Sequence, residues 1–251
     1  MAKRHARRLP AATRPPPPSA NPNRLLASLS PDDYGRLAPS LRVVPLILKD
    51  ILHKPGEPIR DVYFPAGGFC SIVTVLNDGS MVEVATVGRE GMAGMSAIMG
   101  DGASPSATMV QAECDACYRM PVKAFRAEMD RRGRFYELLT RYALALVGIV
   151  MQSTACNAVH TVEQRLARWL LLAHDRVGKD DFPLTQEFVA MMLGATRPTV
   201  TIVAGTLQKA GLITYHRGHL TIVDRERLEA ASCECYRATT DLVSRVYRDG
   251  D

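Results

Sequence analysis

The 251-residue sequence predicts an α+β protein, in which an N-terminal antiparallel β-roll of jelly-roll type leads into a long dimerisation helix and a C-terminal winged helix-turn-helix. Three patterns predict this. Short β-branched runs between turn residues fill 41–120, a helical period of three and four follows Pro121, and two helices with two strands are indicated over 185–223. The predicted segments are a disordered tail (1–24), a roll (25–130), a dimerisation helix (131–160) and the winged domain (161–251).

The tail is rich in proline and arginine and poor in large apolar residues, which is typical of a disordered segment. It carries six basic residues and no acidic one, a charge of +6, whereas the whole chain has a net charge of +5. The remainder therefore carries about one excess negative charge, 25 basic against 26 acidic residues. The overall charge does not by itself indicate a nucleic-acid interface, which has to be sought locally.

The roll is predicted from β-branched and aromatic runs bounded by turns. The expected strands cover Val43–Val44, Val62–Phe64, Ser71–Leu76, Met81–Val87 and one strand from Thr108 to Arg119. Asn77–Ser80 is expected to form a hairpin turn, because Asn, Asp and Gly tolerate positive φ.

Apolar residues recur at spacings of three and four along the helix that follows, which predicts a coiled-coil seam. The expected dimerisation residues are Phe135, Leu138, Tyr142, Ile149 and Cys156. The densest apolar run, Tyr142–Met151, is too short to cross a bilayer, and no apolar stretch follows the basic N-terminus as in a secretory signal. We therefore expect a homodimer in the cytoplasm with no membrane partner.

The C-terminal pattern begins at Thr185, a good N-cap, and predicts a short helix, Gln186–Leu193, that ends at Gly194. After a three-residue turn, a second helix is expected from Arg197 to Ala210, with Pro198 in its first turn. Two strands follow, at Leu212–Tyr215 and His219–Val223. Helix, tight turn, helix and a two-stranded wing make up a winged helix-turn-helix, which predicts binding to double-stranded DNA.

The second of these helices carries the expected reading surface. An arginine at its start, Arg197, suits the O6 and N7 atoms of guanine, and threonines suit phosphate oxygens. No acidic residue lies between Thr196 and Val223. The local positive charge is modest, so affinity is expected to need two copies. The predicted DNA-binding residues are Thr185, Gln186, Thr196, Arg197, Pro198, Thr199, Thr201, Lys209, His216 and Arg217.

The combination resembles the Crp/Fnr superfamily of bacterial transcription regulators over roughly residues 25–230. The likeness is carried by Lys54–Ile59 in the roll, Leu193–Val200 and Leu207–Ile213. It implies a homodimer on a near-palindromic site, RNA polymerase as a further partner, base reading by Arg197 and phosphate contacts from Thr185, Thr196, Thr199 and the wing residue His216. Pro198 and Ile202 replace other base-reading residues of the family, so a different operator is expected.

Whether the roll senses a ligand is open at this stage. Cyclic-nucleotide-binding members of the family hold the phosphate with an arginine, and Pro105 stands at that position between Gly88–Met92 and Thr108. A buried phosphate without a cation is poorly stabilised, so useful affinity for cyclic AMP is not expected and no cofactor is predicted. The alternative is a small-ligand or redox sensor in which effector binding to the roll is the main activity and gates DNA binding. A closed polar cavity at Gly88–Thr108 would favour that alternative over a filled core.

The six cysteines suggest neither a disulfide framework nor a metal site. No cysteine precedes Cys70, so the N-terminal cluster of iron–sulfur members is not expected. Cys114 and Cys117 are three apart in a strand and should point to opposite faces. Cys233 and Cys235 supply only two sulfurs, which leaves a zinc site incomplete. No nucleophile elbow or phosphate loop is present in the sequence, so an enzyme is not expected.

Overall fold

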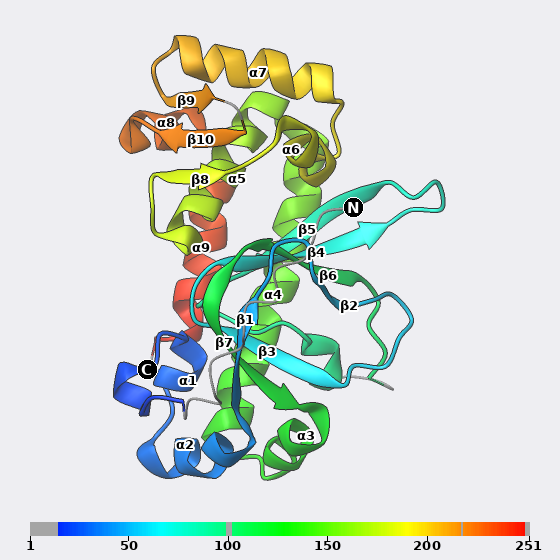
Figure 1. The fold of residues 1–251 in the computed structure, drawn as a ribbon, viewed down its shortest axis with the longest axis vertical. Helices are drawn as coiled ribbons and strands as arrows, with labels where there is room; N and C mark the ends of the chain where they lie inside the picture. The colour runs from blue at the N-terminus through cyan, green and yellow to red at the C-terminus, as the bar shows by residue number, and fades with distance from the viewer. Residues whose placement is uncertain (1–14, 99–101, 217, 249–251) are drawn as a thin grey trace, which may run out of the picture.

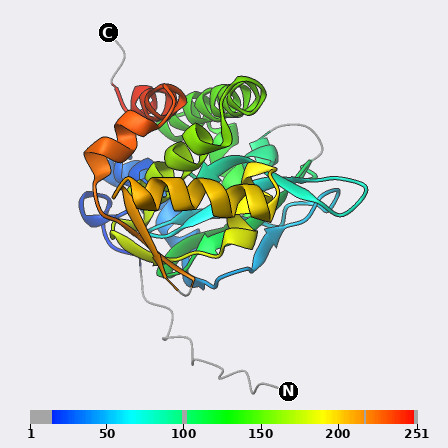
Figure 2. The ribbon, with the colours of Figure 1, turned by 90° about the horizontal axis from the view of Figure 1, so that it is seen from above.

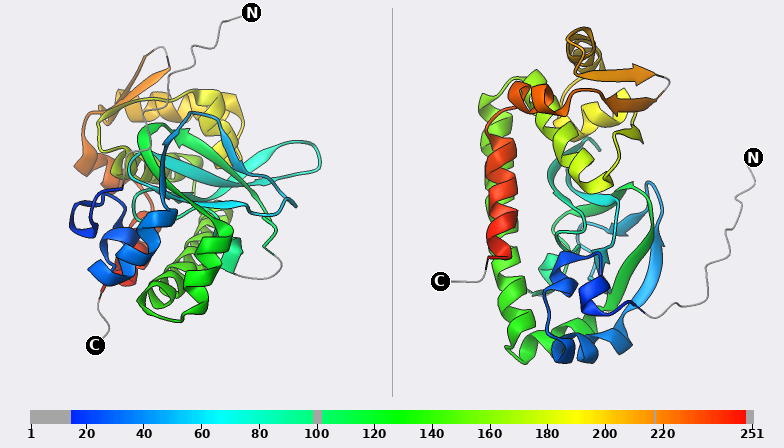
Figure 3. Two further views of the ribbon diagram at one scale, coloured as in Figure 1. Left: turned by 60° about the horizontal axis from the view of Figure 1, so that its bottom comes forward. Right: turned by 90° about the vertical axis from the view of Figure 1, so that its left-hand side faces the viewer.

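One long helix, α4 (Arg134–Val159), runs along the molecule and joins its two halves, as Figures 1 and 3 show. The computed structural model describes residues 15–98, 102–216 and 218–248. The roll packs along one part of α4, and the winged domain lies beyond it at the C-terminal end of the helix. The α+β class and the order of roll, long helix and helix-turn-helix are confirmed.

The roll consists of two antiparallel sheets with strand orders β1-β7-β3 and β2-β6-β4-β5. The strands are β1 (Arg42–Leu46), β2 (Ile51–His53), β3 (Asp61–Pro65), β4 (Phe69–Val75), β5 (Met81–Val87), β6 (Ala107–Ala112) and β7 (Cys114–Pro121). A short 3-10 helix, η3 (Met95–Ile98), follows β5. The expected hairpin joins β4 to β5, with Gly79 at φ 82° and the Asp78 carboxylate accepting from the Ser80 amide at 2.9 Å.

The prediction of one strand from Thr108 to Arg119 is wrong. β6 pairs with β4 and β2, whereas β7 pairs with β1 and β3 in the other sheet. The chain changes sheet at Glu113, between the two strands. No glycine or proline marks that corner, so the apolar pattern reads as continuous.

The prediction of a disordered tail is wrong for residues 15–24. They form η1 (Pro18–Ala20) and lead into α1 (Arg24–Ala27), α2 (Pro31–Leu37) and η2 (Ala38–Ser40). Asn23 is fully buried, and its side-chain amide donates to the carbonyls of Pro65 and Gly91 at 2.9 Å each. Polar side chains thus anchor a segment that has few apolar groups. The rest of the tail, residues 1–14, lies outside the described residues.

The predicted dimerisation seam on α4 is also wrong, because the chain itself covers it. Phe135, Leu138 and Tyr142 pack into the core of the roll, together with α3 (Val122–Asp130). Ile149 and Cys156 are buried nearer the C-terminal end of α4, and the unpredicted helix α9 (Cys235–Val246) runs alongside this part of α4 (Figure 3). The periodicity was real, but it marks contacts within one chain.

A different stripe of α4 faces solvent. Leu144, Val147 and Met151 are 74%, 48% and 68% exposed, at the same spacing of three and four. By length and apolar composition α4 could also cross a membrane, but a third of its most apolar window is buried inside the structure. One side of α4 therefore belongs to the chain's own core, and the other is an apolar surface.

The winged domain contains the predicted helices and one more strand than expected. Its elements are α5 (Val162–Val177), β8 (Asp181–Pro183), α6 (Gln186–Leu193), α7 (Arg197–Lys209), β9 (Ile213–His216), β10 (His219–Ile222) and α8 (Arg225–Ala231). The strands form a sheet in the order β8-β10-β9. Thr161 and Gln164 form a capping box that starts α5, and Gly178 ends that helix at φ 69°.

One apolar cluster continues from the roll into the winged domain. Phe69, Val73 and Met109 of the roll pack in the same cluster as Trp169 and Leu193 of the winged domain. The Phe69 and Trp169 rings meet edge to face, with centroids 6.2 Å apart. The two parts therefore share a core in this conformation.

Candidate nucleic-acid interface

The candidate interface is built on α6 and α7, between which the chain bends by 107°. This angle is typical of a helix-turn-helix, whose helices cross at about 90–120°. Gly194 makes the bend possible with φ 58°, because the left-handed region is costly for other residues. Figure 2 shows α7 lying across the outer surface of the winged domain, with the β9–β10 wing beside it.

The first turn of α7 presents the predicted reading residues. Thr196 is the N-cap, and its hydroxyl accepts from the Thr199 amide at 3.3 Å and contacts the Thr199 hydroxyl at 2.8 Å. Arg197 and Pro198 are exposed in the first turn, and Val200 turns into the core. A helix N-terminus with exposed amide and hydroxyl groups and an arginine favours contact with an anionic backbone.

A second group of predicted residues joins α6 to α7. Thr185 caps α6 by accepting from the Phe188 amide at 3.2 Å. Gln186 accepts a hydrogen bond from the Thr201 hydroxyl at 2.7 Å. This bond fixes the start of α6 against the first turns of α7, so Gln186 and Thr201 already have partners within the protein.

The other predicted residues lie away from that turn. Lys209 is exposed at the opposite end of α7, about 18 Å from Arg197 at 1.5 Å per residue. His216 is exposed at the end of β9, opposite His219 of β10. Arg217 lies outside the described residues. The geometry therefore separates a reading end at Arg197 from contacts at Lys209 and the wing.

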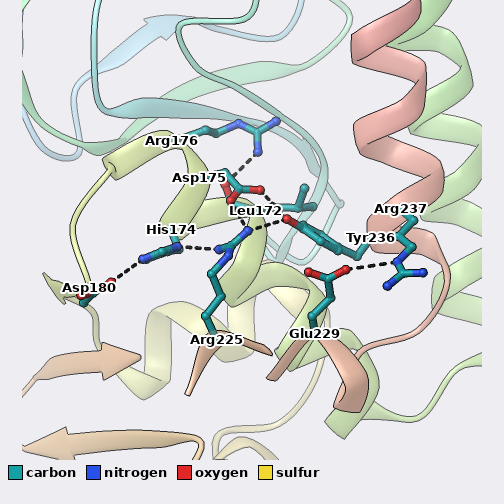
Figure 4. A network of polar contacts seen from close by, with 9 residues as sticks. All are labelled: Leu172, His174, Asp175, Arg176, Asp180, Arg225, Glu229, Tyr236 and Arg237. Carbon is teal, nitrogen blue, oxygen red and sulfur yellow. Dashed lines mark hydrogen bonds and ion pairs between the residues drawn. The ribbon is translucent and has the colours of Figure 1, made fainter. Parts of the chain in front are cut away.

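Behind the wing, a polar network ties α5 to α8 and α9 (Figure 4). The Arg225 guanidinium donates to Asp175 and to the Tyr236 hydroxyl, both at 2.7 Å, and contacts His174 Nδ1 at 2.6 Å. Tyr236 in turn donates to Asp175 at 2.9 Å. Burial, assisted by the Asp175 carboxylate, raises the pKa of Tyr236 to about 12 and keeps this donor protonated. The network stabilises the platform that carries α7.

Glu90, Gly91 and Met92, in the stretch that would line a ligand site in the roll, make packed contacts with α4 and α5. Glu90 is held by Arg176 of α5 at 2.7 and 2.9 Å, and it accepts from the Gly88 amide at 3.0 Å. Met92 is fully buried, and the Tyr142 hydroxyl donates to its carbonyl at 3.3 Å. Glycine is needed at position 91, because a Cβ there would collide with the Tyr142 ring. Residues 99–101 of this stretch are outside the described part of the chain.

A cavity of about 450 Å³ lies beside the start of this stretch, between Arg89 and Glu90, the N-terminal segment, α5 and α9. Charged side chains of both signs line it, among them Arg24, Arg89, Arg176, Glu90 and Asp175. Two of these side chains, Arg176 and Glu90, form an ion pair in the wall of the cavity.

The roll cysteines depart from the predicted geometry. Cys114 and Cys117 pack in one cluster with Cys70, although opposite faces were expected. Two residues separate Cys114 from Cys117 in β7, but only Pro45 separates their pairing partners in β1. This bulge interrupts the alternation of side chains between the two faces of the sheet. Burial raises the pKa of all three thiols, which makes them poor nucleophiles.

The sequence-based expectation of no metal site counted only the two sulfurs of Cys233 and Cys235. Cys233 and Cys235 do not stand alone, because the fold brings Cys156 and His160 of α4 to them. The sequence contained a signal for this group: Cys156 and His160 are four apart on a helix, which places both side chains on one face. The partner pair is more than 70 residues away in the chain, so the sequence did not show that the two halves meet.

Comparisons with known proteins agree with both halves of the fold. Residues 48–132 match the cyclic nucleotide-binding domain, and residues 164–231 match the Crp-like helix-turn-helix domain. A comparison with curated proteins finds no match.

Three solved structures illustrate the likeness in fold. One is a transcriptional regulator assigned to the Crp/Fnr family from Eubacterium rectale, with 21% identity over 84% of this chain and 98% of that chain and a TM-score of 0.63. FixK2 from Bradyrhizobium japonicum shares 15% identity over 77% and 98%, with a TM-score of 0.63. TTHB099, a regulator of the CRP family from Thermus thermophilus, shares 20% over 76% and 98%, with a TM-score of 0.61.

At these identities the solved structures show the fold, and the two domain matches identify its parts along the chain. The helix-turn-helix geometry at α6 and α7 agrees with the second match. The chain is a transcription regulator of the Crp/Fnr type, in which α4 joins a cyclic nucleotide-binding domain to a Crp-like helix-turn-helix domain.

Proposed function

We propose that this regulator binds a near-palindromic double-stranded DNA site as a homodimer, with the first turn of α7 in the major groove. The observation that carries the proposal is the exposed N-terminal turn of α7, where Arg197 projects beside the Thr196 cap. No acidic residue from Thr196 to Val223 opposes a phosphate backbone. Thr185, Thr199, His216 and Lys209 supply flanking backbone contacts, and Gln186 and Thr201 position α7.

The proposed dimer interface is the exposed stripe of α4, made of Leu144, Val147 and Met151. Their spacing of three and four continues a coiled-coil seam on a face that the chain leaves uncovered. Pairing two copies along α4 would present two recognition helices together, which suits a site with two inverted half-sites. The dimer compensates for the modest charge of each copy.

The chain is proposed to work in the cytoplasm with RNA polymerase as a further partner and without catalytic activity of its own. The alternative function, effector sensing by the roll as the main activity, receives less support, because Glu90, Gly91 and Met92 are packed against Arg176 and Tyr142.

Selection of bound duplexes from random DNA tests the proposal. We expect enrichment of two inverted half-sites whose centres lie about one helical turn, roughly 34–36 Å, apart. The same preparation should sediment as a dimer. Enrichment of a single half-site, or of no sequence, would contradict binding as a homodimer to a near-palindrome.

A further inference from the structure

Four metal-ligating side chains meet where α4 ends and α9 begins. Cys156 and His160 lie one turn apart at the end of α4, and Cys233 and Cys235 flank Glu234 at the start of α9. Their ligand atoms all lie within 4.8 Å of one another. The three cysteines are buried and pack chiefly against each other, while His160 is partly exposed.

The spacing of these atoms fits a single tetrahedral ion. Zinc–sulfur bonds of about 2.3 Å and zinc–nitrogen bonds of about 2.0 Å place tetrahedral ligands roughly 3.5–3.8 Å apart. The Cys156 and Cys233 sulfurs are 3.6 Å apart, and the Cys235 sulfur is 3.5 Å from His160 Nδ1. An iron–sulfur cluster would need wider ligands, because several atoms lie between its thiolates.

The surroundings of the group are those of a metal site. The second ring nitrogen of His160, Nε2, faces the Glu234 carboxylate at 3.3 Å. A carboxylate in that place holds the proton on Nε2 and leaves Nδ1 free to ligate. The Gln152 amide donates to the Cys235 sulfur at 3.0 Å, as outer-shell donors do toward thiolates.

Two buried arginines supply an independent observation. Arg165 and Arg168 are buried, and within the described residues the Nε of each lacks a hydrogen-bond partner. Arg168 acts electrostatically on the Cys156 sulfur, and Arg165 interacts with the sulfurs of Cys156 and Cys233. Three thiolates around a divalent ion carry a net negative charge, which these cations would balance.

We propose that Cys156, His160, Cys233 and Cys235 bind one Zn²⁺ ion. Four protein ligands fill a tetrahedral shell, so the site is structural rather than catalytic. The ion would fasten the segment between α8 and α9 to the end of α4, directly before the link into α5 (Figure 3). It would thereby help to hold the winged domain in place on the helix that carries the proposed dimer interface.

The test measures zinc in the full-length protein purified under reducing conditions without chelator. We expect one Zn²⁺ per chain, retained through gel filtration. Replacement by Co²⁺ should give the visible absorption bands of a tetrahedral ion with thiolate ligands. Zinc-free protein that fails to take up either ion, or a Cys156–Cys233 disulfide in place of bound metal, would overturn the proposal.

Variants assign the ligands. Cys233→Ser and His160→Gln should lose the bound zinc, while Cys114→Ser, a cysteine of the roll, should keep it. Glu234→Gln leaves all four ligands in place and should weaken zinc affinity by about 10–100-fold. Circular dichroism identifies variants that fail to fold. If a ligand variant does not fold, the zinc affinity of Glu234→Gln tests the assignment in its place. Full zinc content in folded Cys233→Ser and unchanged affinity in Glu234→Gln would each contradict the assignment.

Discussion

Among single residues, Arg197 is the one whose position argues most directly for base reading. Its side chain leaves the exposed first turn of α7. Replacing Arg197 with alanine should cost about 1–3 kcal/mol of discrimination at one base position and leave binding to random DNA nearly intact. Titrations of the selected site and of its single-base variants, at one fixed salt concentration, measure this directly.

Lys209 provides the matched control for Arg197. It lies exposed at the other end of α7, so we expect it to contact a phosphate rather than the bases near Arg197. Lys209→Ala should weaken binding to the selected site and to random DNA to a similar extent. The slope of log affinity against log salt concentration should fall by about one. If Arg197→Ala behaves like Lys209→Ala, base reading by Arg197 is wrong.

The residues around Glu90 make a prediction about ligands. The Glu90 carboxylate is engaged by Arg176, and Pro105 offers no cation to a phosphate. Cyclic AMP would have to break a buried ion pair in order to use Glu90, which is costly. We therefore expect isothermal titration to detect no binding at low micromolar concentrations. A saturable heat signal in that range would show that the packed arrangement opens for the nucleotide.

At the scale of single elements, α4 allows its two faces to be compared within one helix. Leu144 is 74% exposed, whereas Ile149 is 6% exposed in a cluster with α9 and β5. Leu144→Lys should give a folded monomer, because it places two like charges in the proposed interface. Ile149→Lys should impair folding itself, since an unpaired charge in an apolar site costs several kcal/mol.

Sedimentation and circular dichroism distinguish these outcomes. A Leu144→Lys protein that still sediments as a dimer would exclude this stripe as the interface. A folded, monomeric Ile149→Lys protein would instead restore the buried face as the contact between subunits.

The elements also show which parts of the fold are local in origin. The limits of α6 and the start of α7 agree with the sequence prediction, because Thr185, Gly194 and Thr196 terminate helices through contacts with their own neighbours. α8 has a similar local signal, the Asp224 cap on the Arg227 amide, whereas the N-cap of α9, Glu234, makes no side-chain capping bond.

The features that the sequence did not predict depend on contacts between distant segments. Asn23 is held by carbonyl groups that lie 42 and 68 residues further along the chain. The apolar period of α4 could not indicate whether α9 or a second subunit covers the apolar face of this helix. The cysteine and histidine group at the end of α4 likewise requires the fold to bring two segments together.

For the whole molecule, the contact between the roll and the winged domain contains a buried acid. Glu83 of β5 accepts from Trp169 Nε1 of α5 at 2.9 Å and from the Ser71 hydroxyl. Desolvation outweighs these bonds and raises the pKa of Glu83 from 4.5 to about 7. The shared apolar core around Trp169 makes this carboxyl part of the contact between the two domains.

The raised pKa predicts how stability changes with pH. Between pH 4.5 and about 7 the folded chain holds a proton on Glu83 that the unfolded chain has released. The contribution to stability is fully present below pH 4.5 and is lost as the pH rises through about 7, in total on the order of 3 kcal/mol.

Glu83→Gln should remove this dependence, because the amide keeps an acceptor for Trp169 and cannot ionise. Urea unfolding at several pH values should therefore show the wild-type protein losing stability relative to Glu83→Gln between about pH 4.5 and 7, with no further loss at higher pH, whereas Glu57→Gln, at an exposed site, should follow the wild type. Parallel stability curves for the wild type and Glu83→Gln would mean that Glu83 is already ionised in the folded protein.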